Sequence, residues 1–373
     1  MKILFLQNKG KSYGGVWQVN KMVGEALINE GYDVRVVSIR ENHTDITVTH
    51  DPRMIVETIN TKDIWETYSY RDIIKDIFNI KDFLKKLKSR LKNNFSLKKD
   101  IQKLHQYIFD YKPDYIVTSH YQLLKMIPKT YLCKTFHEQH LAFRDSWAHK
   151  ATRKALLKYK NKVKYIWLCK TTYEAALTHG LSNSYYIYNA VRFETNQIAD
   201  VNQNQKLITI VRLSEEKRID LMTEIVNEIF QDPKYNDWTF EIYGDGPTKE
   251  LIESKIKSSR IKLMGKTDNP QDKLLNASIN LNTSAYEGFS LSILEANECG
   301  IPTISLDFGE SVKEEIIDGK TGFIAKNKDD YIKKLTKLMD DQTLLKDMSL
   351  ECKNYNSKFR IKNIVNDWKK LFK

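Results

Sequence analysis

The sequence lacks the features of a membrane-spanning or disulfide-stabilised protein. Its four cysteines, among 373 residues, lie far apart and form no Cys-x-x-Cys pair, so neither a disulfide framework nor a zinc site is indicated. No apolar run approaches the ~18 residues that a spanning helix needs. The first residues, MKILFLQNKG, hold too short an apolar run for a signal peptide and read as a strand. These absences predict a cytoplasmic protein.

Acidic residues are also fewer than basic ones. The chain has 48 acidic and 60 basic residues, which gives a net charge of +12. The excess is concentrated in residues 80–103, where nine Lys or Arg stand against two Asp and the apolar residues follow helical spacing. We therefore predict a basic amphipathic helix. It either packs on its own domain as an ordinary surface helix or contacts an anionic membrane surface or polymer.

Alternating strand and helix patterns run through both halves of the chain. The first half opens with a strand at residues 2–7, a glycine-bearing loop, a helix at 16–31 and a second strand at 32–39. After a polar stretch, the same order restarts with a strand at 206–213. The repetition predicts an α/β fold of two doubly wound, Rossmann-like domains that face a cleft. Ligands of such sheets bind beyond the carboxyl ends of the strands.

The polar stretch RFETNQIADVNQNQ marks the predicted domain boundary. We expect a first Rossmann-like domain, a linker, a second Rossmann-like domain and a C-terminal helix that crosses back toward the first domain. Their predicted ranges are 1–191, 192–205, 206–350 and 351–373.

The stretch AYEGFSLSILEANECG (residues 285–300) places one glutamate on each side of a helix start. Ser290 is the predicted N-cap, and the free N–H groups and dipole of the helix favour a phosphate there. Glu295 lies five residues further on, roughly 7–8 Å along the axis, where a carboxylate can accept from both hydroxyls of a ribose. Glu287 precedes the cap and suits the hydroxyls of a group beyond the phosphate. Sugar, phosphate and ribose in this order indicate a nucleotide sugar.

Cations for a diphosphate come from the loop after the strand at 206–213. Arg212 can donate hydrogen bonds to two phosphate oxygens at once, and Lys217 supplies a compact positive charge. Gly15, after the first strand of the chain, permits close backbone approach to the same phosphates, although a Gly-Gly pair most often just forms a turn. His137 ends an apolar strand and is either a catalytic or a structural histidine.

Backbone groups at strand ends and at the helix start are further candidates for donor binding. They belong to Gly265, Phe289, Ser290 and Leu291. The sequence has no Asp-x-Asp pair and no cluster of metal-ligating side chains. We therefore expect Arg, Lys and the helix dipole to handle the leaving diphosphate without a metal ion, and we predict no cofactor apart from the nucleotide-sugar donor.

The segment from about residue 207 to 325 resembles glycosyltransferase family 4, the retaining enzymes of the two-Rossmann GT-B fold. RLSEEK is similar to the family's Arg-Leu-Ser-x-x-Lys, and YGDGP to its Gly-x-Gly-Pro turn. EGFSLSILEANECGIPTIS resembles its Glu-x7-Glu signature, and EEIIDGKTGFI the segment that follows. In the first half, GG at 14–15, TFHEQH and YNAV match more loosely.

The resemblance implies a role for each candidate side chain. Arg212 and Lys217 would bind the donor diphosphate, Glu287 the donor sugar and Glu295 the ribose, with Gly15 under the phosphates and His137 beside the reacting sugar. The first domain would bind the acceptor and the second the nucleotide sugar. Family members are thought to transfer the sugar on the face from which the diphosphate leaves, and the leaving group itself can take the acceptor's proton.

Several positions depart from the family pattern. They are Ser290 and Ser292 for Gly and Pro, Arg218 for Gly, Glu310 for the second Gly of a pair, and Arg192 for Asp. None of these changes removes a predicted charged contact. The Ser-rich variant resembles members that act on cell-envelope polymers such as teichoic acids, capsule or lipopolysaccharide.

Together these observations predict a retaining transferase that moves a hexose or N-acetylhexosamine from a nucleotide sugar, UDP-linked by expectation, to an envelope glycan or polyol-phosphate acceptor. We expect it at the inner face of the cell membrane. An epimerase or hydrolase of the same fold stays open, as does a catalytically silent partner subunit. An epimerase or hydrolase needs acids or bases poised against the sugar ring. Nucleic acid is disfavoured as a partner, because the basic segment has few aromatics and no nucleic-acid motif.

Overall fold

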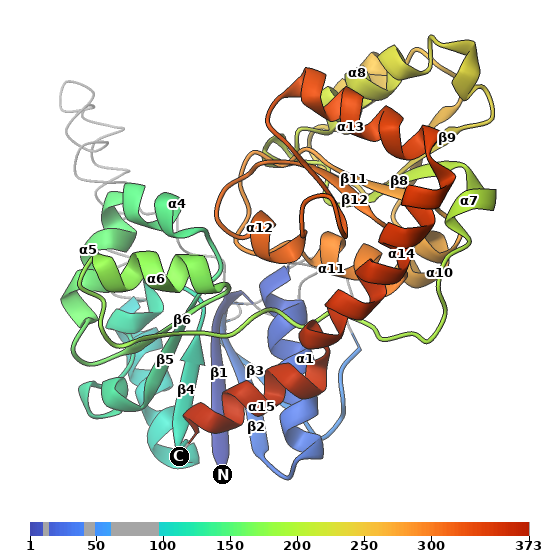
Figure 1. Cartoon of the computed structure of the whole chain (residues 1–373). Coiled ribbons are helices and arrows are strands. Elements are labelled where there is room, and N and C mark those ends of the chain that lie inside the picture. The colour runs from blue at the N-terminus through green and yellow to red at the C-terminus, as the bar shows by residue number, and fades with distance from the viewer. Residues whose placement is uncertain (10–14, 41–48, 61–96, 373) are drawn as a thin grey trace, which may run out of the picture. The chain divides into compact units, whose positions relative to one another are not determined.

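The computed structural model describes residues 1–9, 15–40, 49–60 and 97–372 (Figure 1). Most of the basic segment predicted at 80–103, and Gly14, lie outside the described residues. The chain forms two compact units. The first contains Met1–Glu138, Lys150–Ile166 and Leu181–Asn183, and the second contains Gln139–His149, Trp167–Gly180 and Ser184–Lys373.

The first sheet has seven strands in the order β3-β2-β1-β4-β5-β6-β7. They are β1 (Lys2–Lys9), β2 (Asp33–Arg40), β3 (Ile55–Asn60), β4 (Tyr115–Thr118), β5 (Thr135–Gln139), β6 (Lys164–Trp167) and β7 (Ser184–Tyr186). Strand β1 pairs in parallel with β2 on one side and β4 on the other. Its apolar run from Ile3 to Leu6 is fully buried, as expected for a parallel strand that is covered on both faces.

Helices accompany this sheet. After β1 comes α1 (Gly15–Asn29), which buries Trp17, Val23 and Leu27. Residues 97–111 form another long helix, and α5 (Lys150–Tyr159) precedes β6. Two shorter helices, α4 (Phe143–Ala148) and α6 (Lys170–Thr178), belong to the second unit.

The second sheet has six parallel strands in the order β10-β9-β8-β11-β12-β13. They are β8 (Lys206–Ile210), β9 (Thr239–Tyr243), β10 (Ile261–Gly265), β11 (Ile279–Asn282), β12 (Thr303–Leu306) and β13 (Gly322–Ala325). The order repeats that of the first six strands of the first sheet. In both sheets the first strand is central, and the chain reverses direction across the sheet beside it.

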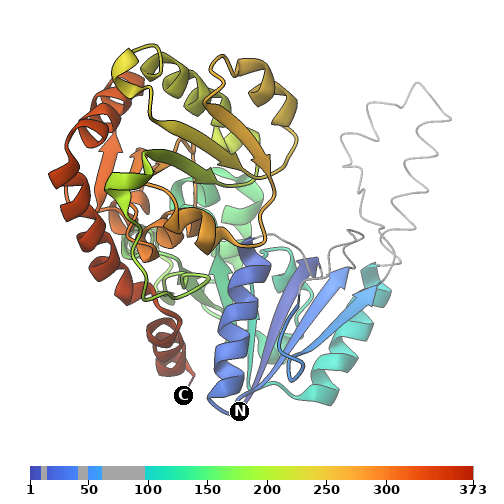
Figure 2. The same cartoon turned by 90° about the vertical axis from the view of Figure 1, so that its right-hand side faces the viewer.

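Helices cover both faces of the second sheet, with α8 and α13 over one face and α10 and α11 over the other (Figure 1). The helices are α7 (Val201–Asn204), α8 (Ile219–Ile229), α9 (Lys249–Lys255), α10 (Pro270–Leu275), α11 (Leu291–Glu298), α12 (Val312–Glu315), α13 (Lys328–Asp340), α14 (Gln342–Asn356) and α15 (Ile361–Leu371). Figure 2 shows α14 descending along one side of the unit, with α15 at its lower end.

The predicted fold class, an α/β fold of two doubly wound domains, is confirmed by the two strand orders. The C-terminal segment differs in one respect from the single helix that the sequence predicts. A short 3-10 turn at Ser357–Phe359 and an extended Arg360 separate α14 from α15. Whether α15 crosses to the first domain stays a prediction. Among the described residues, no helix has the length and apolar character that crossing a membrane requires.

Candidate functional site

Two loops of the second unit lie side by side where the strand order of the sheet reverses. One follows β8 (residues 211–218, the β8 loop), and the other follows β11 (residues 283–290, the β11 loop). Because β8 and β11 pair in parallel, their carboxyl ends meet at the same edge of the sheet. In doubly wound sheets this reversal is where ligands bind.

Hydrogen bonds that involve the backbone join the two loops. The Thr283 hydroxyl lies 2.9 Å from the carbonyl oxygens of Lys217 and Arg218. The Ala285 N–H donates to the carbonyl oxygen of Glu216 at 2.8 Å. The loops therefore keep a fixed spacing, and the side chains that they carry form one surface.

The Gly-x-Gly turn after β9 supports the β8 loop. The Leu213 N–H donates to the Asp245 carbonyl at 3.0 Å. Gly244 has a φ of +146°, and a Cβ there would lie 1.8 Å from the carbonyl oxygen of Val211, so only glycine fits. Arg212, predicted for the diphosphate, is exposed on the loop that this turn supports.

Glu287 and Lys217 form an ion pair across the two loops. Lys217 Nζ lies 2.7 Å from Glu287 Oε2. The other carboxylate oxygen accepts from Ser284 Oγ at 2.6 Å and from Asn282 Nδ2 at 3.2 Å. Burial raises the pKa of Glu287, but Lys217 and the two neutral donors outweigh it, so the pKa lies below its ordinary value. Glu287 is therefore an ionised carboxylate that three side chains orient.

The start of α11 closes this site. Ser290 is its N-cap residue, as predicted, but the Ser290 hydroxyl does not cap the helix and instead lies 3.0 Å from Ser292 Oγ. Leu291 is half-buried, and Phe289 packs beside Leu294 in an apolar cluster. A helix start without a side-chain cap leaves its first N–H groups available for an anion.

A buried carboxyl group that was not predicted from the sequence lies behind this helix start. Glu315, on α12, is fully buried, and its Oε1 accepts the Ser290 N–H at 3.0 Å. Burial, together with the nearby charge of Glu287, raises the pKa of Glu315 well above its ordinary value. Glu315 therefore keeps its proton at a pH where Glu287 has lost its own.

Glu295, predicted for the ribose, is fully buried on α11 and pairs with Arg192. Arg192 Nε donates to Oε1, and Nη2 donates to Oε2 at 2.6 Å. The charge of Glu295 raises the pKa of Arg192. In the sequence, Arg192 stands out only as a departure from the family pattern, because its partner lies 103 positions away.

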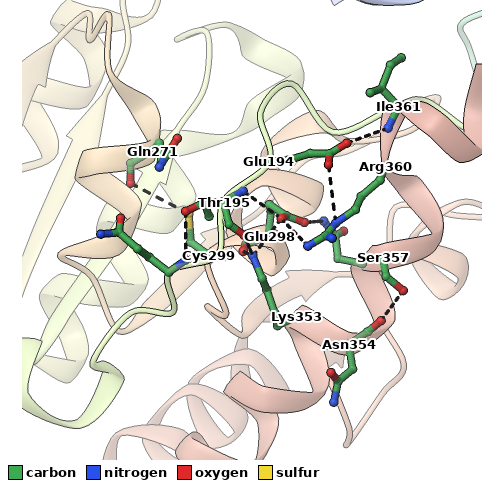
Figure 3. A network of polar contacts seen from close by, with 12 residues as sticks. Glu194, Thr195, Gln271, Glu298, Cys299, Lys353, Asn354, Ser357, Arg360 and Ile361 are labelled. Carbon is green, nitrogen blue, oxygen red and sulfur yellow. Dashed lines mark hydrogen bonds and ion pairs between the residues drawn. The ribbon is translucent and has the colours of Figure 1, made fainter. Parts of the chain in front are cut away.

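A second buried acid, Glu298, anchors the other end of α11 (Figure 3). Its carboxylate accepts from Lys353 Nζ at 2.9 Å, Asn356 Nδ2 at 2.8 Å and Arg360 Nη2 at 3.2 Å. It also accepts the Thr195 N–H at 3.2 Å. This network joins α11, the segment before α7, and the break between α14 and α15.

Three other predicted residues lie elsewhere. His137 is fully buried in β5 of the first unit, with Nδ1 3.1 Å from the Thr118 carbonyl oxygen. Gly15 is exposed at the start of α1, also in the first unit. Gly265 ends β10, and its carbonyl accepts the N–H of Gly244 at 2.8 Å, next to the turn that supports the β8 loop. The functional roles of all three stay predictions.

The part of the chain that the structure describes contains no group of three or more His, Cys, Asp or Glu side chains that could hold a metal ion. The cations at the β8 loop and the N–H groups of α11 are the groups there that could neutralise a phosphate. Independence from a metal stays a prediction.

Residues 191–358 match the family model described as glycosyl transferases group 1. The poly(ribitol-phosphate) alpha-N-acetylglucosaminyltransferase of Staphylococcus aureus is 27% identical over 249 residues, which cover 62% of this chain and 48% of that protein. The poly(glycerol-phosphate) alpha-glucosyltransferase of Bacillus subtilis is 27% identical over 134 residues, 34% of this chain and 20% of that protein. The chain thus spans about half of the first relative and a fifth of the second. The predicted resemblance to cell-envelope glycosyltransferases is confirmed.

The fold is that of solved GT-B structures. A single-site mutant of S. aureus TarM, in complex with fondaparinux, alpha-GlcNAc-glycerol and UDP, gives a TM-score of 0.76 at 16% identity, with all of both chains covered. At this identity the likeness concerns the fold alone. Residues 191–358 are therefore similar to the glycosyl transferases group 1 model, and the chain has the GT-B fold.

Proposed function

We propose that the chain is a retaining glycosyltransferase that moves a hexose or N-acetylhexosamine from a UDP-sugar to a polyol-phosphate or other envelope glycan. The observation that carries this proposal is the Lys217–Glu287 ion pair, which joins the β8 and β11 loops where the strand order reverses. It puts a cation and an oriented carboxylate beside a helix start that suits a phosphate. A diphosphate with a sugar on one side and a nucleoside on the other matches this set.

Each group then has one task. Arg212, Lys217 and the first N–H groups of α11 neutralise the diphosphate. Glu287 accepts hydrogen bonds from hydroxyls of the donor sugar, and Glu295 accepts from the ribose. We assign Gly15 to the phosphates and His137 to the reacting sugar, as the family resemblance implies.

The reaction breaks the bond between the anomeric carbon and the phosphate oxygen. A bond from an acceptor oxygen to the same carbon forms on the same face, so the anomeric configuration is retained. The acceptor's proton passes to an oxygen of the leaving diphosphate, which Arg212 and Lys217 hold nearby. The charge that develops on that diphosphate is the charge that these cations stabilise, which lowers the barrier.

The acceptor class follows from two supporting observations. The named relatives act on poly(ribitol phosphate) and poly(glycerol phosphate). This chain carries a net charge of +12, which favours an anionic polymer or an anionic membrane surface through long-range attraction. The proposal therefore places the enzyme at the cytoplasmic face of the membrane.

A donor panel tests the proposal without knowledge of the acceptor. UDP-glucose, UDP-N-acetylglucosamine, their galacto epimers and GDP-mannose are compared by thermal shift and diphosphate release, without added metal, in the wild type, Glu287→Ala and Glu295→Ala. We expect one donor to raise the melting temperature selectively and Glu295→Ala to abolish the shift. No shift with any nucleotide sugar would contradict the proposal, and full diphosphate release without acceptor would indicate a hydrolase.

A further inference from the structure

A cavity of about 530 Å³ with charged walls lies in the second unit, outside the set of side chains described above. Sites for small ligands have volumes of about 300–1,000 Å³. Three cations, two carboxylates and a hydroxyl line the cavity: Arg144, Lys313, Lys326, Asp307, Glu310 and Thr171. Such walls suit a ligand that has both negative charge and hydroxyl groups.

The cavity lies at the edge of the sheet that carries the candidate site. Asp307 and Glu310 follow β12, and Lys326 follows β13. Strands β11, β12 and β13 pair in parallel, so these loops leave the sheet at the same edge as the β11 loop with Glu287. Ligands of doubly wound sheets bind beyond this edge.

Helix α12 connects the cavity to the candidate site. The Glu315 carboxylate accepts the Ser290 N–H at the start of α11. The preceding residue, Glu314, accepts the N–H and the hydroxyl of Thr171, on the cavity wall, at 2.7 and 2.6 Å. Adjacent residues of one short helix thus hold the helix start of the site and a wall of the cavity.

The segment that leads into α4 is a second connection. A Cβ at Gly288, in the β11 loop, would lie 2.0 Å from the His140 carbonyl oxygen. The backbone of the loop therefore packs directly on this segment, at a position that only glycine fits. Arg144, four residues after His140, lines the cavity. Two contacts thus place the cavity next to the site that contains Glu287.

Lys313 and Asp307 compensate each other within the cavity wall. Lys313 Nζ lies 3.5 Å from Asp307 Oδ2, and the other carboxylate oxygen accepts the Gly309 N–H at 3.0 Å. Gly309 has a φ of +124°, which favours glycine. The ion pair and this turn fix the β12 loop (residues 307–311), which presents Glu310.

The other charged groups remain available to a ligand. Among the described residues, no ion pair involves Lys326 Nζ or the Glu310 carboxylate. Arg144 Nε lies 3.6 Å from Asp145, its neighbour in the sequence, but the Arg144 side chain is 65% exposed. Since such an exposed pair contributes little, the guanidinium can turn to an anion. Two cations against one carboxylate favour an anionic ligand, and the carboxylate can accept from its hydroxyls.

We propose that this cavity is a subsite for the acceptor and binds the polyol-phosphate chain beside the unit that receives the sugar. Arg144 and Lys326 hold a phosphate of the chain, and Glu310 accepts a hydrogen bond from a hydroxyl of the polyol. The inference rests on the proposed function, because it takes the acceptor class from there. It also gives a role to the glutamate at position 310, which departs from the glycine of the family pattern.

Calorimetric binding of a synthetic oligo(glycerol phosphate), with UDP present at saturation, tests the subsite without any transfer reaction. Arg144→Gln/Lys326→Gln should weaken binding of the oligomer about 5- to 30-fold, because two exposed ion pairs with phosphate are lost. UDP binding, measured separately, should change by less than about twofold. Lys257→Gln/Lys333→Gln is the matched control. It removes two exposed lysines of the same unit and should leave both affinities unchanged.

An oligo(trimethylene phosphate) tests Glu310, because it carries the same charges as the glycerol oligomer but lacks the hydroxyl on the central carbon. The wild type should bind the glycerol oligomer about threefold or more tightly than the trimethylene oligomer, because a hydrogen bond to the carboxylate is gained. Glu310→Ala should lose this preference. Glu310→Gln keeps a neutral acceptor and should retain part of it.

The outcomes separate the inference from the proposed function. An unchanged affinity for the oligomer in Arg144→Gln/Lys326→Gln, or an equal loss in the control variant, overturns the inference and leaves the transferase proposal standing. Tighter binding of the oligomer in Glu310→Ala also overturns it, since Glu310 would then repel the phosphate. An equal loss of UDP binding would assign the cavity to the donor and overturn it as well. If the wild type binds UDP but not the oligomer, only the inference fails, and if it binds neither, both fail.

Discussion

The pKa values of two carboxyl groups of the site, Glu287 and Glu315, are shifted in opposite directions. Glu287 faces Lys217, Ser284 and Asn282, all of which stabilise its negative charge. Glu315 is fully buried, and the hydrogen bonds that it accepts offset only part of the cost of charging it there. Because two neighbouring charges without enough compensation are unfavourable, one acid ionises and the other stays neutral.

Glu315→Gln should change the pH dependence of stability. The pKa of Glu315 is raised on folding from about 4.5, so the unfolded chain loses this proton first as the pH rises. The wild-type free energy of unfolding therefore falls above about pH 4.5, by up to about 1.4 kcal/mol per pH unit, until the pH passes the folded pKa. Gln does not titrate in this range. Denaturant unfolding at pH 5, 6.5 and 8 should therefore show the free energy of unfolding of the variant rising relative to that of the wild type as the pH rises. Glu253→Gln, exposed on α9, is the control. A difference that stays constant with pH would refute a neutral Glu315.

Lys217→Ala should weaken nucleotide binding and disturb Glu287 together. The variant removes a cation from the diphosphate site and leaves the Glu287 carboxylate without its ion-pair partner. Loss of a hydrogen bond to a charged group predicts about 10- to 100-fold weaker binding of UDP, measured by calorimetry. Lys249→Ala, on the exposed start of α9, should change the affinity little. A change of less than about twofold in Lys217→Ala would remove Lys217 from the site.

At the scale of elements, α11 organises the second unit through its two buried acids. Glu295 pairs with Arg192, and Glu298 accepts hydrogen bonds from Thr195 in the linker and from Arg360 at the break before α15 (Figure 3). The helix is short, with eight residues, so tertiary contacts rather than its own propensity must hold it.

Glu298→Ala should destabilise the second unit strongly. It leaves Lys353, 12% exposed as a side chain, and Arg360 without their shared carboxylate. Removing one partner of a buried charged network costs about 3–5 kcal/mol, which denaturant unfolding can measure. The double variant Lys353→Met/Glu298→Leu removes the charges of Lys353 and Glu298 together. Its free energy of unfolding should fall by less than that of Glu298→Ala alone. A loss below about 1 kcal/mol in Glu298→Ala would show that the network contributes little.

The elements of the fold were predictable where local patterns are strong. The apolar runs of β1 and β8, the stripe of α8 and the Gly-x-Gly turn are all readable from spacing. The break between α14 and α15 was not, because no Pro or Gly marks it. It arises from the burial of Phe359 and the bond of Arg360 to Glu298, which are tertiary contacts.

The candidate site was predictable in part, and for a similar reason. Spacing and family resemblance identified Lys217 and Glu287, and the structure brings them together. Arg192 and Glu315 were missed as site residues because their partners lie 103 and 25 positions away in the sequence. A departure from the family pattern at position 192 was the one available signal.

At the scale of the whole molecule, the charge balance predicts how the enzyme meets its acceptor. Neutralising Lys85, Lys86, Lys88 and Arg90, which lie outside the described residues, should raise the KM for a polyol-phosphate acceptor several-fold and reduce its salt dependence. Donor binding should not change. The control replaces four exposed lysines of the second unit: Lys249, Lys257, Lys333 and Lys346. An equal loss of donor binding would mean that the basic segment acts on the fold rather than on the acceptor.

The central claim is retaining transfer from a nucleotide sugar, and product analysis tests it most directly. The wild type is incubated with the donor that the thermal-shift panel selects and with poly(ribitol phosphate) or poly(glycerol phosphate). Mass spectrometry measures added sugar, and proton NMR measures its anomeric configuration. We predict one hexose or N-acetylhexosamine per modified unit, with the α configuration of the donor kept and the product absent in Glu287→Ala. A β-linked product, or transfer that persists undiminished in Glu287→Ala, would contradict the account.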